Sequence, residues 1–198
     1  MNQTYMKEKK IFPLVMSMAL PMMLSMAFNS LYNIVDSYFV AKLSEDAMTA
    51  LSLVYPAQNL LTAVAVGFGV GVNAMISFYL GAQNQEKADK TATQGMELGV
   101  LHGVLLMILF LCGMNWFLGM FTKSDTVRAL GMEYSNVVFL FSTIVTGGIT
   151  LEKIFQAVGR MRATMVSMIA GFVTNIVLDP LLILSLIHIS EPTRPISI

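Results

Sequence analysis

Five apolar blocks, separated by short polar connections, account for most of the chain. They occupy residues 12–40, 51–80, 95–121, 134–158 and 163–187. Each block approaches or exceeds the roughly 20 residues with which a helix crosses the hydrocarbon core of a bilayer. Apolar residues fill the blocks almost continuously instead of recurring at a helical or strand period. The pattern predicts five transmembrane helices, several of them long enough to tilt or to extend beyond the membrane core.

The composition supports a membrane location. Hydrophobic residues make up 56% of the 198 residues and charged residues only 12%, whereas about 25% of an ordinary soluble domain is charged. We therefore expect an all-α integral membrane protein with the lipid bilayer as its surroundings. The net charge is zero and no dense basic cluster indicates nucleic acid as a partner. The single cysteine, Cys112, excludes disulfides within the chain and metal sites built from several cysteines.

Lysine and arginine residues are unevenly divided between the two sides of the membrane. Eight lie in the N-terminal tail and the second and fourth connections: Lys7, Lys9, Lys10, Lys87, Lys90, Lys153, Arg160 and Arg162. Three lie on the other side: Lys42, Lys123 and Arg128. Cytoplasmic segments of membrane proteins are enriched in lysine and arginine. We therefore expect a cytoplasmic N-terminus, with the first, third and fifth helices running outward.

Four acidic residues within the apolar blocks fall into two kinds. Glu97 and Glu152 lie within one or two turns of a cytoplasmic helix end, and Lys153 adjoins Glu152. We expect these two side chains to extend to the interface and to have no further role. Asp36 and Asp179 lie in the outer half of the membrane, and neither has a lysine or arginine within one helical turn. A carboxylate there must be protonated, hydrogen-bonded or neutralised by a cation.

Polar residues accompany both aspartates. Tyr32 lies one turn before Asp36, Asn33 shares the same face of that helix, and Asn175 lies one turn before Asp179. Hydrogen-bonding between helices is one explanation. Acids within a membrane usually mark functional sites, so we expect these five residues to form a cation-binding and coupling site.

The residue types leave the identity of the cation open. Carboxylate and amide oxygens are hard ligands that suit Na⁺, and a desolvated carboxyl group suits a proton. A Na⁺ site would consist of Asp36, Asn175 and Asp179. No cofactor is expected besides the coupling ion.

Pro21 interrupts the first apolar block between two polar stretches. A proline within a helix frees a backbone carbonyl and creates a point of bending. We expect Pro21 to act as a conformational hinge, with a static kink as the alternative.

Glycines recur every fourth residue in the third block. Gly95, Gly99 and Gly103 share one helical face, which is typical of a packing surface between membrane helices. His102 lies beside them, and a packed or hydrogen-bonded histidine is the expected reading of this residue.

Three stretches resemble the N-terminal half of the multidrug and toxic compound extrusion (MATE) family: LPMMLSMAFNSLYNIVDSYFVAKL, LGAQNQEKADK and GRMRATMVSMIAGFVTNIVLDPLLI. The resemblance covers nearly all of residues 11–183, and its most specific feature is LYNIVD in the first helix paired with NIVLDP in the fifth. It implies a secondary antiporter that exports drugs or toxic organic compounds, typically cationic or amphipathic, in exchange for Na⁺ or H⁺. It also implies two six-helix lobes in a monomeric, multi-pass protein of the bacterial plasma membrane, and it excludes an enzyme.

The same resemblance assigns roles by position. Asp36 is implied to be the carboxylate of the N-lobe cation site, with Tyr32 as its neighbour and Asn175 and Asp179 as partners from the fifth helix. Pro21 is implied to be the proline about which the first helix bends.

The organisation expected from these observations has three parts. Residues 1–10 form a cytoplasmic tail, and residues 11–183 form a partial N-lobe of about five helices that lacks a sixth helix and the second lobe. Residues 184–198 are expected to be a non-native tail, because LSLIHISEPTR matches the translation of a sequencing adapter. A fragment of this kind is expected to be inactive in transport.

Other functions agree less well with the sequence. A flippase for lipid-linked saccharides would present cationic residues to a central cavity, and no lysine or arginine lies in the middle of a block. An intramembrane aspartyl protease could use two aspartates that share a proton. Its usual Gly-x-Gly-Asp motif is missing before Asp36 and Asp179. A structural helper subunit would not explain two clusters of acids and amides.

Overall fold

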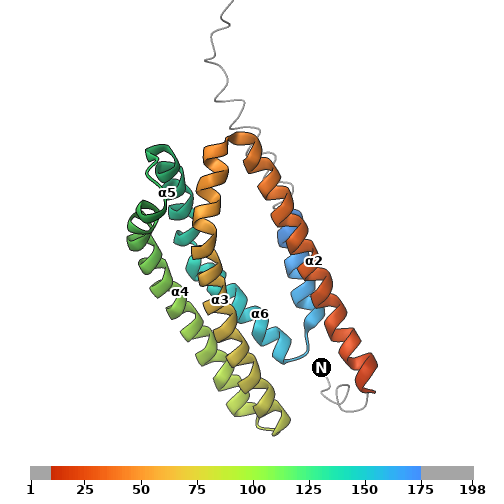
Figure 1. The fold of residues 1–198 in the computed structure, drawn as a ribbon. Coiled ribbons are helices and arrows are strands. Elements are labelled where there is room, and N and C mark those ends of the chain that lie inside the picture. Colours follow the sequence, from red (N-terminus) through yellow and green to blue (C-terminus); the bar gives the residue numbers. More distant parts are fainter. Residues whose placement is uncertain (1–9, 175–198) are drawn as a thin grey trace, which may run out of the picture. The chain divides into compact units, whose positions relative to one another are not determined.

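The computed structural model describes residues 10–174, and every regular element in this range is a helix. The helices are α2 (Ile11–Leu43), α3 (Glu45–Gly81), α4 (Gln85–Phe121), α5 (Asp125–Leu140) and α6 (Ser142–Ala157), followed by an apolar helix at Met161–Thr174 (Figure 1). In α2 the backbone is described throughout, but not the side chains of Met18, Asn29, Tyr32, Asn33, Asp36 and residues 38–43. The expected all-α fold is confirmed.

The chain divides into two compact units. Residues 43–160 form one unit, which contains α3 to α6, and the remaining residues form the other, which contains α2 and the helix Met161–Thr174. Within the larger unit, α3, α4 and α6 contact one another, and α5 packs against α3 and α4. This four-helix unit carries most of the described packing.

The helices are longer than the apolar blocks that predicted them. Polar connections were expected around residues 41–50 and 81–94, but α3 begins at Glu45 and α4 at Gln85. Both starts are capped: the Ser44 hydroxyl accepts the amide of Ala47 at 3.0 Å, and the Asn84 side chain accepts the amide of Lys87 at 3.0 Å. Hydropathy marks only the membrane-embedded part of a helix, whereas capping residues mark its true start. The expected boundaries were therefore wrong by six to ten residues at these two starts.

The fourth predicted span, residues 134–158, is not one straight helix. It corresponds to α5 and α6, which are separated at Phe141 and bent by 47°. The amides of Ile144 and Val145 both bond to the Phe141 carbonyl, at 3.0 and 3.1 Å, so α6 restarts immediately after the bend. The prediction of one continuous helix was wrong here.

Within the described residues, α2, α3 and α4 are each long and apolar enough to cross a membrane. The bent pair α5–α6 gives a fourth span if it crosses as one unit. The fifth predicted helix, residues 163–187, begins as the helix Met161–Thr174, and its remainder lies outside the described residues.

The interior of the larger unit consists of small clusters, while many large apolar side chains face outward. Seven buried residues form the main cluster: Val54, Ala57, Leu61, Phe110, Met114, Leu118 and Phe139. The rings of Phe110 and Phe139 stack with centroids 4.4 Å apart. Trp116 is 72% exposed and Ile144 is 70% exposed. Because a lipid chain is as apolar as leucine, such outward-facing residues are ordinary in a membrane bundle.

The glycine face of α4 is a packing surface, as predicted. Gly95, Gly99 and Gly103 are all buried. A Cβ atom at Gly95 would lie 2.6 Å from the Val72 side chain of α3. At Gly99 it would overlap the hydroxyl of Thr150, and at Gly103 that of Thr146, both on α6. The absence of side chains brings the α4 backbone directly onto α6 at Gly99 and Gly103, and onto α3 at Gly95.

We expect Gly103→Ala to destabilise the protein. A Cβ atom at this position would also lie 2.7 Å from the Thr143 Cα, so the two helix backbones must separate. Overpacking of this kind costs about 1–3 kcal/mol. Thermal unfolding of the detergent-solubilised protein, followed by circular dichroism, measures the loss.

The matched control for this prediction is Gly113→Ala in the same helix. A Cβ atom at Gly113 meets nothing within 4 Å, so the melting temperature should stay the same or rise. Equal melting temperatures for the two variants would show that α4 and α6 are not in close backbone contact.

Candidate functional site

The predicted cation site falls only partly within the described residues. Tyr32, Asn33 and Asp36 all belong to α2, so the helical spacing on which the prediction depended is present in the backbone. Their side chains are not described, and Asn175 and Asp179 lie outside the described residues. The assignment of these five residues to one site therefore stays a prediction.

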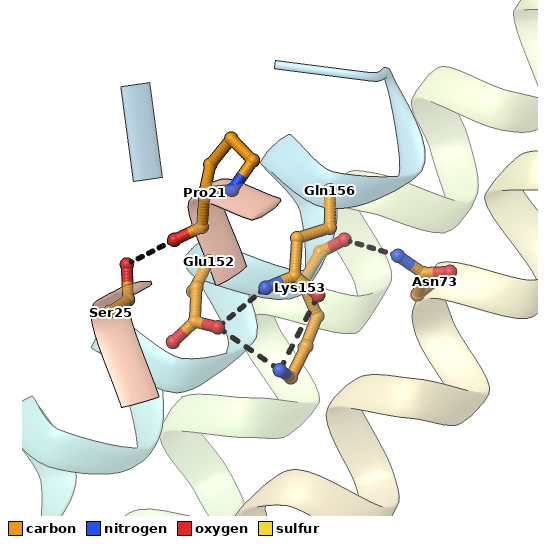
Figure 2. Close-up of polar contacts among 6 residues, drawn as sticks. All are labelled: Pro21, Ser25, Asn73, Glu152, Lys153 and Gln156. Carbon is orange, nitrogen blue, oxygen red and sulfur yellow. Dashed lines mark hydrogen bonds and ion pairs between the residues drawn. The ribbon is translucent and has the colours of Figure 1, made fainter. Parts of the chain in front are cut away.

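Pro21 lies inside an uninterrupted helix. The backbone of α2 remains helical from Ile11 to Leu43, although Pro21 cannot donate an amide hydrogen bond. The Ser25 hydroxyl, which belongs to a buried side chain, donates to the Pro21 carbonyl at 2.9 Å (Figure 2). A serine that bonds back to the preceding turn is often associated with helix bending. Hinge motion at Pro21 stays a prediction.

A second group of polar residues, which the sequence did not single out as a site, lies on α6. Glu152 Oε1 accepts two hydrogen bonds, one from Lys153 Nζ at 3.0 Å and one from Gln156 Nε2 at 2.6 Å. Lys153 Nζ also lies 3.4 Å from Gln156 Oε1. Figure 2 shows the three side chains converging within one turn of the helix. We call these three residues the α6 triad.

Two residues of α3 support the α6 triad. The Asn73 side chain donates to the backbone carbonyl of Lys153 at 2.8 Å, which ties the end of α6 to α3 (Figure 2). Gly69 lies one turn before Asn73, and a Cβ atom there would be 2.8 Å from the Lys153 Cγ. The bare backbone at Gly69 thus provides the space for the aliphatic part of the lysine.

The α6 triad adds detail to the prediction for Glu152. We expected this carboxylate, with Lys153 beside it, to extend to the membrane interface, and that expectation stays a prediction. The side chains of Lys153 and Glu152 are only 14% and 22% exposed, and they form an ion pair. The sequence held a signal for this arrangement, since Gln156 follows Glu152 by one helical turn and Gly69 and Asn73 share one face of α3. The prediction for Glu97 is untested, and that residue is exposed on α4.

Two further expectations concern histidine and metal binding. The His102 Nδ1 lies 2.7 Å from the Leu98 carbonyl, and its ring lies 4.7 Å from the Phe68 ring. The expected packed and hydrogen-bonded histidine is therefore confirmed. Among the side chains that the structure describes, which do not include that of Asp36, no group of three histidine, cysteine, aspartate or glutamate residues could hold a metal ion.

Long apolar helices and close glycine contacts between them are typical of a polytopic membrane protein. A family model described as MatE matches residues 21–181, which is most of the chain. The chain belongs to the MATE family of transporters.

Individual relatives agree with this assignment. The chain is 29% identical over 180 residues to the multidrug export protein MepA of Staphylococcus aureus. The matched region covers 90% of this chain and 40% of that protein. It is 28% identical over 183 residues to MepA of Staphylococcus haemolyticus, with 92% of this chain and 40% of that protein covered. The chain thus spans about 40% of the length of these relatives.

A solved structure agrees as well. A MOP superfamily transporter from Pyrococcus furiosus superimposes with a TM-score of 0.84 at 28% identity. The match covers 87% of this chain and 38% of that chain.

Proposed function

We propose that the complete protein to which this chain belongs is a cation-coupled exporter of drugs or toxic organic compounds. The observation that carries the proposal is the match of residues 21–181 to the MATE family together with MepA, a multidrug export protein, as a relative over 90% of the chain. These relatives favour export of small molecules over saccharide flipping or proteolysis. The transported molecules are cationic or amphipathic, and the protein is not an enzyme.

The coupling site of the proposed exporter consists of Asp36, Tyr32 and Asn33 on α2 with Asn175 and Asp179. Asp36 and Asp179 support this assignment most strongly, because both are acids in apolar sequence blocks without a basic neighbour within one helical turn. The residues suit either Na⁺, with Asp36, Asn175 and Asp179 as ligands, or H⁺.

The chain forms part of one lobe in this proposal. Residues 11–183 contribute about five helices of the N-lobe, residues 1–10 lie in the cytoplasm, and residues 184–198 are not native. The coverage of about 40% of each relative's length supports a partial lobe. We propose a monomeric protein of the bacterial plasma membrane, in which alternating access between two lobes moves the substrate. The isolated chain would be inactive, because one incomplete lobe cannot enclose a substrate.

Bending of α2 at Pro21 would contribute to the alternating access. Similar MATE structures exist in a bent and in a straight conformation. The bond from Ser25 to the Pro21 carbonyl supports Pro21 as the point of bending.

Substitution of either aspartate should abolish drug resistance. The complete gene is expressed in a host that lacks its own exporters, alongside Asp36→Asn and Asp179→Asn. Asparagine keeps the size and hydrogen-bonding capacity of the side chain but not its charge, so cation binding should be lost. Minimum inhibitory concentrations of cationic drugs should fall to the level of the empty vector for both variants.

Glu97→Gln is the control for this experiment, because Glu97 is an acid of α4 outside the proposed site and glutamine keeps its size without its charge. It should keep full resistance at equal membrane abundance. Resistance that survives Asp36→Asn and Asp179→Asn would refute the coupling site, and a complete gene that confers no resistance would count against drug export.

Recovery of the gene from uninterrupted genomic DNA tests the proposed extent of the chain. The reading frame should depart from this sequence near residue 184 and continue through a sixth helix and a second lobe. The same codons followed by a stop at residue 198 would refute the proposal that the tail is not native.

A further inference from the structure

The α6 triad is a built arrangement and not an accidental surface contact. Neighbouring residues on a helix point about 100° apart and rarely face each other. Here Lys153 and Glu152 nevertheless pair at 3.0 Å, and Gln156 bonds the carboxylate from one turn further on. Gly69 of α3 makes room for the lysine stem. The fold thus supplies an internal counter-ion to a carboxylate that is only 22% exposed.

The pair leaves part of the carboxylate available. Both bonds from Lys153 and Gln156 go to Oε1 of Glu152, and within residues 43–160 no donor bonds to Oε2. A carboxylate has about four acceptor positions, so the present partners do not saturate it. Lysine is also the more mobile of the basic side chains, a point charge on a flexible stem. Its ammonium can leave Glu152 without movement of either helix backbone.

The position of the α6 triad suits a ligand that arrives from the cytoplasm. Glu152 lies five residues before the end of α6 at Ala157, and Arg160 follows this end. Asn73, which holds the triad to α3, lies eight residues before the end of α3 at Gly81. Under the proposed orientation both ends are cytoplasmic.

We propose that Glu152 is a binding residue for organic cations, and that Lys153 occupies it until such a cation arrives. The charged nitrogen of the ligand displaces the lysine ammonium and pairs with the carboxylate, while Gln156 keeps the carboxylate oriented. The site rests on the proposed export function, and it is separate from the coupling site around Asp36. Lys153 acts as a built-in competitor, so weak or uncharged ligands are excluded.

Equilibrium binding of ethidium, a permanently charged aromatic cation, tests the proposal. The purified complete transporter is titrated with ethidium by fluorescence. Glu152→Gln should raise the Kd about tenfold, the factor that a charge-assisted hydrogen bond contributes. Lys153→Met should lower the Kd about threefold, because it removes a partly exposed ion pair that competes with the ligand. The double variant should bind as weakly as Glu152→Gln alone.

A purely structural ion pair gives a different pattern. Each single variant would then lower both the stability of the protein and its affinity for ethidium. The double variant would recover stability and binding together. That result, or a Kd that no variant changes, would overturn the proposal. Glu97→Gln on α4 is the matched control for loss of an acid and should leave the Kd unchanged.

Binding is measured without transport so that the two proposals can fail separately. Ethidium binding that depends on Glu152 in a protein that exports nothing would contradict only the export function. If the protein exports drugs but its Kd for ethidium is unchanged by Glu152→Gln, only the proposed binding site at Glu152 is contradicted. A complete transporter that binds no ethidium would contradict the organic-cation site outright.

Discussion

Close backbone contact between α4 and α6 is the constraint on which the larger unit depends. In a bilayer, helices gain no hydrophobic energy by leaving lipid for each other, so association relies on dispersion and on interhelical hydrogen bonds. The glycines at 99 and 103 permit this close approach, and the hydroxyls of Thr150 and Thr146 fill the space against them. The contact also fixes where the other end of α6 meets α3. The α6 triad lies at that meeting point, so its geometry follows from the glycine packing.

Charged side chains in the larger unit have different kinds of partner. Some pair with an opposite charge, and others bond to a neutral amide. Lys153 and Glu152 neutralise each other within one turn of α6. Nearer the other end of the unit, Arg128 donates to the Asn115 side chain at 2.7 and 3.0 Å, so this cation is partnered by a neutral amide. Leaving one member of a desolvated ion pair alone costs more than the pair itself contributes. In the proposed site, a cation that pairs with Glu152 takes the place of the Lys153 ammonium, which must find other partners on its flexible stem.

The sequence predicted the helical membrane fold because long apolar blocks have few alternative structures. It also predicted the glycine face of α4, where the four-residue spacing translates directly into a helical surface. It failed at the bend in residues 134–158, since Phe141 is neither a proline nor a glycine and nothing local marks the break. The capped starts at Ser44 and Asn84 carried a recognisable signal that hydropathy does not use.

Prediction of the candidate sites was limited by distance along the chain. The contact of Lys153 with Gly69 and Asn73 joins residues about 80 positions apart, and no spacing rule within one helix shows such a pair. The predicted pairing of Asp36 with Asp179 is of the same kind. It was inferred from the depth of the two acids in outward-running apolar blocks, and the family resemblance implies the same pair. The two carboxylate sites therefore have different foundations: sequence position and family resemblance for the aspartates, and described geometry for Glu152.

We propose that an ion gradient drives export by the complete protein. The most direct test reconstitutes the complete transporter into liposomes and follows ethidium movement while a Na⁺ or a H⁺ gradient is imposed. Ethidium should move in the direction opposite to one of the two ions as that ion flows down its gradient. This movement should stop when an ionophore collapses that ion gradient. Ethidium movement at the same rate with and without either gradient would contradict cation-coupled export.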